Sequence, residues 1–307
     1  MKKTLSIISI GLLILISFFS CKKITDTVNN TTTHKLAKIL LLDSGTNNYL
    51  HGKIEFTYDS LERCKSITYI SISFAHNSKQ TFYYIGNNRN PSFYIPEQIG
   101  PPPYNNKYDT FFLKYDAENY IVKDSQIVST FSMAIVNEYT VAGNIVYGNK
   151  RIYDLINSST VPLTPGYPAT VFTQQISGGN ILSQNCINNH DIGGPDSTRA
   201  ELRYTFDNKI HPLFESSPLR YRISQANIYP YIDPEFLYAT NLYTNNFNKN
   251  NIKTAEHKIF YPALSNTIFS TYYVSYNYTY DIDGYPIAAR ATGNPSLEPY
   301  RYEFHYY

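Results

Sequence analysis

The chain has 307 residues and a formal net charge of +2, with 31 Tyr, 17 Phe and no Trp. Of the 26 Lys and Arg, Lys2 and Lys3 lie in an expected N-terminal signal. Their removal leaves 24 basic residues, equal to the 24 acidic ones. This balance argues against nucleic-acid partners, which need a basic face. The many Tyr and Phe favour β-strands, where a Tyr ring packs while its hydroxyl reaches water.

The N-terminus has the pattern of an exported lipoprotein. A basic start, Met1-Lys2-Lys3, precedes an apolar run from Leu5 to Phe19 and then Ser20-Cys21. The apolar run is short for a membrane span and has the length of a signal peptide. A small residue followed by Cys resembles the bacterial lipoprotein box, which implies cleavage before Cys21 and lipid on its sulfur and amino group. Ordinary secretion with an incidental Cys is the alternative.

Domain boundaries follow from this start. We predict a signal peptide over residues 1–20, then the lipidated Cys21 with a polar, flexible tether over residues 21–34. Residues 35–307 are then a single β-rich domain. An anchor of several acyl chains holds a protein stably on a membrane. The expected location is the outer membrane, with the protein facing the periplasm or the cell surface.

Alternating apolar and polar residues predict strands along most of the chain, since a period of two places one face on a core and one in water. The predicted strands cover residues 36–42, 53–58, 70–74, 81–85, 111–115, 121–128, 131–139, 144–153, 202–206, 276–280 and 300–306. The Pro-rich segments 91–106 and 161–168 are predicted to be loop or edge.

Four of these strands end in the same short unit, an alternating apolar stretch closed by Asp59, Asp116, Asp207 or Asp281. A carboxylate at a strand end accepts hydrogen bonds from the N–H groups of the following turn. Asp281-Ile282-Asp283-Gly284 also resembles the start of a calcium loop, but the twelfth position is Thr292 and not Glu. We therefore interpret it as a hairpin turn, with Gly284 at positive φ.

The residue pattern changes between the third and fourth of these units, which end at Asp207 and Asp281. Asp233-Pro234-Glu235 is typical of a helix start, with an acid at the N-cap and Pro in the first turn. We predict a short helical crossover around residues 212–246. The fold class is therefore mainly β, an antiparallel meander of hairpins in one long twisted sheet that can curl toward an open barrel.

The order of these features resembles a known family. A lipoprotein signal is followed by Phe56-Thr57-Tyr58-Asp59, by Tyr204-Thr205-Phe206-Asp207 and by Tyr278-Thr279-Tyr280-Asp281. Together they are similar to Bacteroidota cell-envelope lipoproteins of unknown function, whose hairpins look like the YD repeats of Rhs-type shells. The resemblance implies a β-hairpin fold in the cell envelope and no assigned catalytic residues.

Few residues suggest reaction chemistry. No two His have the spacing of a helical zinc site, and His190-Asp191 with Asp196 is a weak cluster. There is no Gly-x-Ser-x-Gly elbow. We predict no metal, no cofactor and no enzymatic activity. Cys64 and Cys186 are interpreted as two separate buried thiols, with a disulfide between them as the alternative.

The tyrosines least explained by a sheet lie near Pro-rich or helical segments and are the candidate ligand-binding residues: Tyr94, Tyr104, Tyr108, Tyr167, Tyr229 and Tyr231. Sugar sites commonly combine aromatic faces with polar groups, so a glycan or an envelope protein is the expected partner. We therefore predict a non-enzymatic binding module with an exposed aromatic patch. A structural scaffold would have a patch-free exterior, and a carbohydrate-active enzyme would hold two acids in a cleft.

Overall fold

The computed structural model describes residues 34–43, 49–72, 77–99, 110–117, 121–128, 133–154, 170–188, 198–212, 214, 248–260, 267–293 and 300–307. All of them belong to one compact unit, His34–Tyr307. The expected signal peptide, Cys21 and the tether up to residue 33 lie outside the described residues. Within the part of the chain described, no helix is long and apolar enough to cross a membrane.

The described residues form sixteen strands in an antiparallel meander: β1 Leu36–Asp43, β2 Leu50–Tyr58, β3 Cys64–Ser71, β4 Asn77–Tyr83, β5 Phe93–Ile99, β6 Phe111–Tyr115, β7 Ile121–Val128, β8 Met133–Ala142, β9 Ile145–Asp154, β10 Thr170–Ser177, β11 Asn180–Asn188, β12 Thr198–Ile210, β13 Asn250–Phe260, β14 Ile268–Tyr280, β15 Pro286–Gly293 and β16 Tyr300–Tyr306. Each strand pairs with its neighbour in the chain. The mainly β, antiparallel prediction is therefore confirmed.

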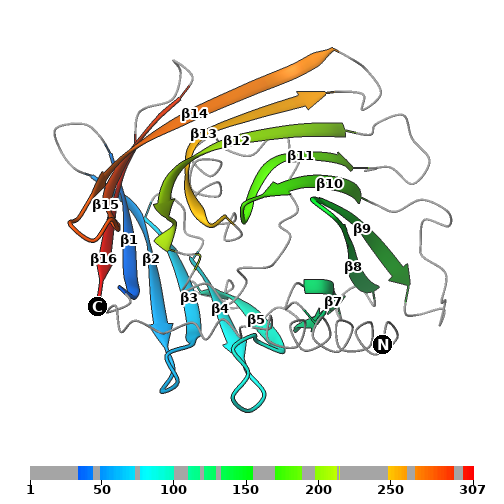
Figure 1. Ribbon diagram of the computed structural model, residues 1–307. Helices are drawn as coiled ribbons and strands as arrows, with labels where there is room; N and C mark the ends of the chain where they lie inside the picture. Colours follow the sequence, from blue (N-terminus) through cyan, green and yellow to red (C-terminus); the bar gives the residue numbers. More distant parts are fainter. Residues whose placement is uncertain are drawn as a thin grey trace, which may run out of the picture. The chain divides into compact units, whose positions relative to one another are not determined.

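The sheet closes on itself, which corrects the expectation of an open sheet. β1 pairs with β16, with Ile39 opposite Phe304 and Leu41 opposite Tyr302. Figure 1 shows the first and last strands side by side. Because β1 pairs with β16, neither the first nor the last strand is a free edge of the sheet. The first and last described strands therefore complete the fold together.

The two faces of the wall differ in polarity. One face carries a continuous apolar cluster in which Ile39, Phe172 and Tyr302 are at most 1% exposed. Side chains inside a closed barrel can pack against other walls, whereas those on its outer surface have nothing opposite them. The apolar cluster therefore lines the interior. Its alternation along β2 and β14 is the one predicted, with Ile54, Phe56 and Tyr276 buried.

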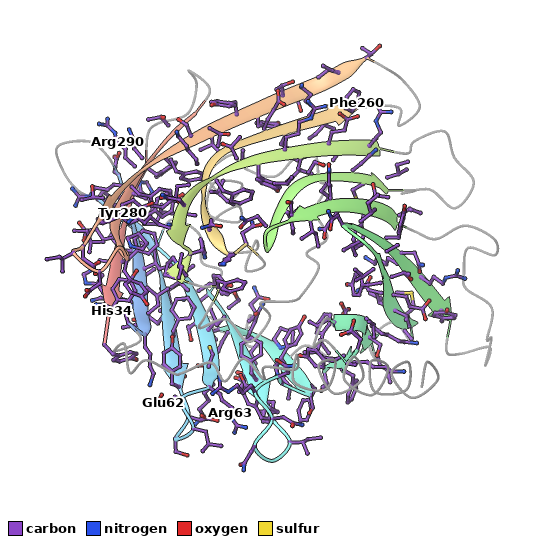
Figure 2. All side chains as sticks on the ribbon, viewed as in Figure 1. His34, Glu62, Arg63, Phe260, Tyr280 and Arg290 are labelled. Atoms are coloured by element: carbon purple, nitrogen blue, oxygen red, sulfur yellow. The ribbon has the colours of Figure 1, made fainter. Side chains whose placement is uncertain are left out.

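The outer face is rich in charge. Residues two apart on one strand pair along it, as in Lys53–Glu55 at 2.6 Å and Glu256–Lys258 at 2.9 Å. Exposed pairs of this kind contribute roughly 0–1 kcal/mol each to folding stability. Their main effect is to keep the outer face hydrated. Arg290, labelled in Figure 2, belongs to the same face and is exposed. The same face also exposes apolar side chains, namely Phe112, Ile127, Tyr147, Val171, Leu182, Tyr273 and Ile287.

Two of the four Asp units, those of Asp59 and Asp281, are hairpin turns as predicted, whereas Asp207 lies within β12 and the turn after Asp116 is only partly among the described residues. Asp281 Oδ1 accepts hydrogen bonds from the N–H of Asp283 at 3.0 Å and of Tyr285 at 2.8 Å. Asp59 Oδ1 accepts from the N–H of Leu61 and of Arg63 in the same spacing. Gly284 has a φ of 86°, which a residue without a side chain adopts at no steric cost. The Asp281 carboxylate thus binds backbone N–H groups.

Two segments differ from expectation. The helical crossover over 212–246 is not confirmed, because only Pro212 and Phe214 of that range are described. The Pro-rich segment from residue 91 contains β5, an internal strand. Pro96 lies opposite Gln80 of β4, while β5 pairs with β6 only at Phe93 and Tyr94. Among the described residues, the β6 side of Pro96 has no ladder partner, so a residue without an N–H is tolerated there.

The two described cysteines are free and buried, which confirms the interpretation as separate thiols. Burial raises the pKa of the Cys186 thiol to about 12 and that of Cys64 further. Thiols of this kind are inert packing residues, since the thiolate is the reactive form.

Candidate functional site

The structure describes one residue of the predicted tyrosine site, Tyr94. Its ring is 2% exposed and stacks on Phe111 with centroids 4.7 Å apart, with Phe82 on its other neighbour strand at 5.7 Å. Tyr94 is therefore packed in the interior, and its part in a ligand site stays a prediction. The remaining candidates lie outside the described residues: Tyr104, Tyr108, Tyr167, Tyr229 and Tyr231.

The outer wall instead carries a depression of about 600 Å³ across β9, β10, β11 and β12, lined by both polar and apolar residues. Strand register brings its lining together in two rows. The first row contains Tyr147, Thr173, Asn185 and Glu201, each opposite the next across a strand pair. The adjacent row contains Ile145, Gln175, Ser183 and Arg203. Both rows lie on the outer face, since the alternate positions Val146 and Phe172 are interior.

The lining combines one aromatic ring with several hydrogen-bonding groups. Tyr147 is 47% exposed, so its ring is open to a ligand. Glu201 is held by Arg199, with Nη2 and the carboxylate oxygen 3.6 Å apart. Amide and hydroxyl groups of Asn185, Gln175 and others supply both donors and acceptors. The depression can therefore stack a flat apolar surface and hydrogen-bond the hydroxyls around it.

Gln174 and Gln184, which lie between the two rows and also line the depression, pair with each other on the inner face of the wall. The side-chain amide of Gln174 donates to Gln184 Oε1 at 2.8 Å, and both residues are buried. Their pairing crosses β10 and β11, the two central strands of the depression. The outer residues Thr173, Gln175, Ser183 and Asn185 flank these two glutamines in sequence. The pairing of Gln174 with Gln184 therefore fixes β10 and β11 relative to each other, and with them the four outer residues.

A second polar cluster lies inside the barrel. Asp124 is 1% exposed and accepts hydrogen bonds from Asn137 Nδ2 and from the Tyr139 hydroxyl, each at 2.6 Å. Burial lowers the pKa of the Lys150 amine, an effect that the negative charge of Asp124 opposes. Both carboxylate oxygens of Asp124 have a donor, so this cluster is a satisfied structural network.

Neither cluster provides a metal site. Among the described residues, no group of three or more His, Cys, Asp or Glu side chains is arranged to hold a metal ion. His34 lies 3.7 Å from Asp281 Oδ2 and 3.6 Å from Asp283 Oδ2, and its ring stacks on Tyr285. This contact joins the start of the barrel to the β14–β15 turn. The predicted weak cluster of His190, Asp191 and Asp196 lies outside the described residues.

Sequence reasoning missed the depression for a physical reason. Its residues come from four strands, and β10 (Thr170–Ser177) was not predicted as a strand. Tyr147 lies between the interior residues Val146 and Gly148. This alternation predicted a strand, but it did not indicate a binding site. Only the register between strands places Tyr147 beside Thr173 and, further along the row, Glu201.

No protein-family model matches the chain, and no curated protein matches it. Two crystal structures are similar to it. One is a porin-like protein from Bacteroides vulgatus ATCC 8482, with 13% identity and a TM-score of 0.42 over 89% of this chain and 99% of that chain. The other is a porin-like protein from Bacteroides uniformis ATCC 8492, with 11% identity and a TM-score of 0.47 over 90% of this chain and 98% of that chain.

Proposed function

We propose that the chain is a lipid-anchored β-barrel protein of the cell envelope that binds a glycan-type ligand on its outer wall without transforming it. One observation carries the binding role. An exposed ring, Tyr147, lies in a depression whose other lining groups are amides, hydroxyls, one carboxylate, one guanidinium and the aliphatic side chains of Ile145 and Leu202. Sugars have apolar C–H faces that stack on aromatic rings and hydroxyls that hydrogen-bond to such groups.

The envelope location is supported by the N-terminal sequence and by the outer wall. The lipoprotein box at Cys21 and the resemblance to Bacteroidota lipoproteins favour an anchor. Charged residues along strands such as β2 and β16 suit a wall surrounded by water. A barrel with this exterior is held at a membrane by its lipid, facing the periplasm or the cell surface. Incorporation of labelled palmitate in cells tests this, and labelling that survives Cys21→Ala would refute it.

The binding role is tested on a glycan array with the whole chain, purified from membranes in detergent. Tyr147→Ala is expected to weaken binding at least about tenfold, because loss of about 1.4 kcal/mol of ring contact corresponds to that factor. Tyr273→Ala is the matched control, since Tyr273 is equally exposed on the same face but outside the depression. The proposal would be wrong if the chain bound no glycan on the array, or if Tyr147→Ala and Tyr273→Ala bound equally well.

Two other roles make different demands. A structural scaffold needs no aromatic ring in an outer depression, so binding lost in Tyr147→Ala distinguishes it. A retaining or inverting glycosidase needs two carboxylates facing each other. Glu201 is the one carboxylate among the residues that line the depression. We therefore expect the array ligand to be recovered unchanged after incubation, and release of shorter sugars would favour the enzyme.

A further inference from the structure

The lining of the outer depression changes from one side to the other. At β9 it is apolar, with Ile145 40% and Tyr147 47% exposed. At β12 it is charged, with Glu201 and Arg203. The outer residues of β10 and β11 between them carry hydroxyl and amide groups. A ligand that fills the depression therefore meets an apolar surface at one end and ionised groups at the other.

The negative charge at the β12 end is already neutralised. Arg199 Nη2 lies 3.6 Å from the Glu201 carboxylate. The guanidinium of Arg199 also covers the ring of Phe260, with its central carbon 4.0 Å from the ring centroid. These two contacts hold Arg199 beside Glu201. Glu201 thus offers hydrogen-bond acceptors to a ligand, while its ion pair as a whole carries no net charge.

The positive charge of Arg203 has no such partner. Its side chain is exposed at the β12 end of the depression. Glu256 of β13 lies directly opposite it across the strand pair, but Glu256 Oε1 pairs with Lys258 Nζ at 2.9 Å. Among the described residues, no carboxylate forms an ion pair with Arg203. The N–H donors of its guanidinium are therefore available to a ligand.

An exposed arginine without an ion pair is not a site by itself. Arg290 of β15, labelled in Figure 2, is also exposed on the outer face and has no ion pair within the described part of the chain. Arg203 differs because it lines a depression that holds the open ring of Tyr147. Stacking surface, hydrogen-bonding groups and one uncompensated cation together match a sugar that carries an acid group.

The strand order sets the length of such a ligand. β10 and β11 lie between β9 and β12, so Tyr147 and Arg203 are three strand spacings apart. At about 4.8 Å for each spacing, this separation is roughly 14 Å. A single sugar ring cannot reach both residues, whereas a short oligosaccharide can. Thr173 and Ser183 are among the outer residues that it would cross.

We propose that the ligand of the depression is an acidic oligosaccharide that lies across β9 to β12, with one sugar ring on Tyr147 and a carboxylate on Arg203. A planar guanidinium donates two parallel N–H groups to the two oxygens of a carboxylate. The hydroxyl and amide groups of β10 and β11 hydrogen-bond the sugars between the two ends. This inference rests on the proposed function and adds to it the charge and the length of the glycan.

The test applies the whole chain to an array of uronic and sialic acid glycans, from single sugars to short chains. Each acidic glycan is printed beside its methyl ester, and neutral oligosaccharides are printed on the same array. Esterification removes the charge and leaves the rings and hydroxyls in place. Arg203→Gln removes the positive charge, and Arg203→Lys keeps the charge without the planar fork. Arg290→Gln is the matched control.

Short acidic chains are expected to bind at least about tenfold more tightly than their methyl esters and than single acidic sugars, the factor that one hydrogen-bonded charge supplies. Arg203→Gln is expected to abolish this preference for acid over ester. Arg203→Lys should keep part of the preference, and Arg290→Gln should keep all of it.

The outcomes separate this inference from the proposed function. Binding of neutral glycans that is lost in Tyr147→Ala but unchanged in Arg203→Gln would overturn the acidic ligand and leave the proposed function standing. A preference for acids that Arg203→Gln retains as fully as Arg290→Gln would also overturn it, because the charge would then be recognised elsewhere. Absence of binding to any glycan would overturn both.

Discussion

The ring of Phe172 on β10 lies directly over Gly148 on β9. A Cβ added at position 148 would meet Phe172 Cζ at 2.0 Å, well inside contact distance. The two residues are directly opposite in the strand pair, and the ring also approaches Tyr139, with centroids 5.8 Å apart. An aromatic ring that covers a strand glycine restores the packing that the glycine lacks.

Gly148→Ala is therefore expected to destabilise the barrel by about 1–3 kcal/mol, the usual cost of forcing an extra carbon into a packed core. The measurement is the free energy of unfolding from urea titration. The cost should shrink in a Phe172→Leu background, because the smaller side chain leaves room for the methyl group. Equal costs in the two backgrounds would show that Phe172 does not restrict position 148.

Burial of His257 predicts a pH-dependent stability. Burial lowers its pKa from the usual 6.5 to about 4, because the interior disfavours the charged ring. The unfolded chain binds the proton at the ordinary pKa, so stability is complete above about pH 6.5 and is lost as the pH falls toward 4. The loss attributable to this one group is at most about 3 kcal/mol. His211, also buried, has the same shift and the same sign.

His257→Gln isolates this contribution, because the amide does not titrate between pH 7.5 and 4.5. Urea unfolding at several pH values in that window is expected to show a shallower decline for the variant than for the original chain. A matched control is His305→Gln, which removes a half-exposed His from the outer face. Parallel pH profiles for the His257 variant and the original chain would contradict the assignment.

The Asp59–Arg63 pair predicts a second, more acidic dependence. Burial alone would raise the pKa of the Asp59 carboxyl, but hydrogen bonds from Arg63 and from the N–H of Leu61 outweigh it and lower the pKa. Stability from this group is therefore present above its ordinary pKa of 3.8 and is lost as the pH falls through the lowered value. Asp59→Asn should reduce the melting temperature at pH 7 and have less effect near pH 3. An equal reduction at both pH values would argue against it.

The inner Asp124 cluster predicts a large structural effect. Asp124→Ala would leave the Asn137 amide and the Tyr139 hydroxyl buried without their acceptor, and would leave Lys150 without its nearby negative charge. The expected cost is about 3–5 kcal/mol, as for breaking one side of a buried polar pair. Tyr139→Phe removes a single hydrogen bond from the same cluster and should cost about 1–2 kcal/mol. Unfolding free energies of the two variants that agree within error would contradict this ranking.

Local patterns were predictable because they depend on neighbouring residues. The alternation in β2 and β14 has a period of two, so Ile54 and Tyr276 could be assigned to the buried face before their partners were known. The Asp59 and Asp281 turns were predictable for the same reason, because the carboxylate binds N–H groups two and four residues away. The interior position of Tyr94 was not predictable. Phe93 and Tyr94 are both aromatic, and only the pairing of β5 with β4 and β6 decides which of the two rings is interior.

The sequence by itself determined the strand alternation and the hairpin turns at Asp59 and Asp281, whereas the structure decided between two separate thiols and a disulfide. Tertiary structure decided the closure of β1 onto β16, a pairing between residues more than 250 positions apart. It also decided the outer depression, because cross-strand register and not sequence distance brings Tyr147 and Glu201 into one row. A hairpin is specified by contacts within a few residues. A closed barrel and its sites depend on every register between strands, which no local pattern contains.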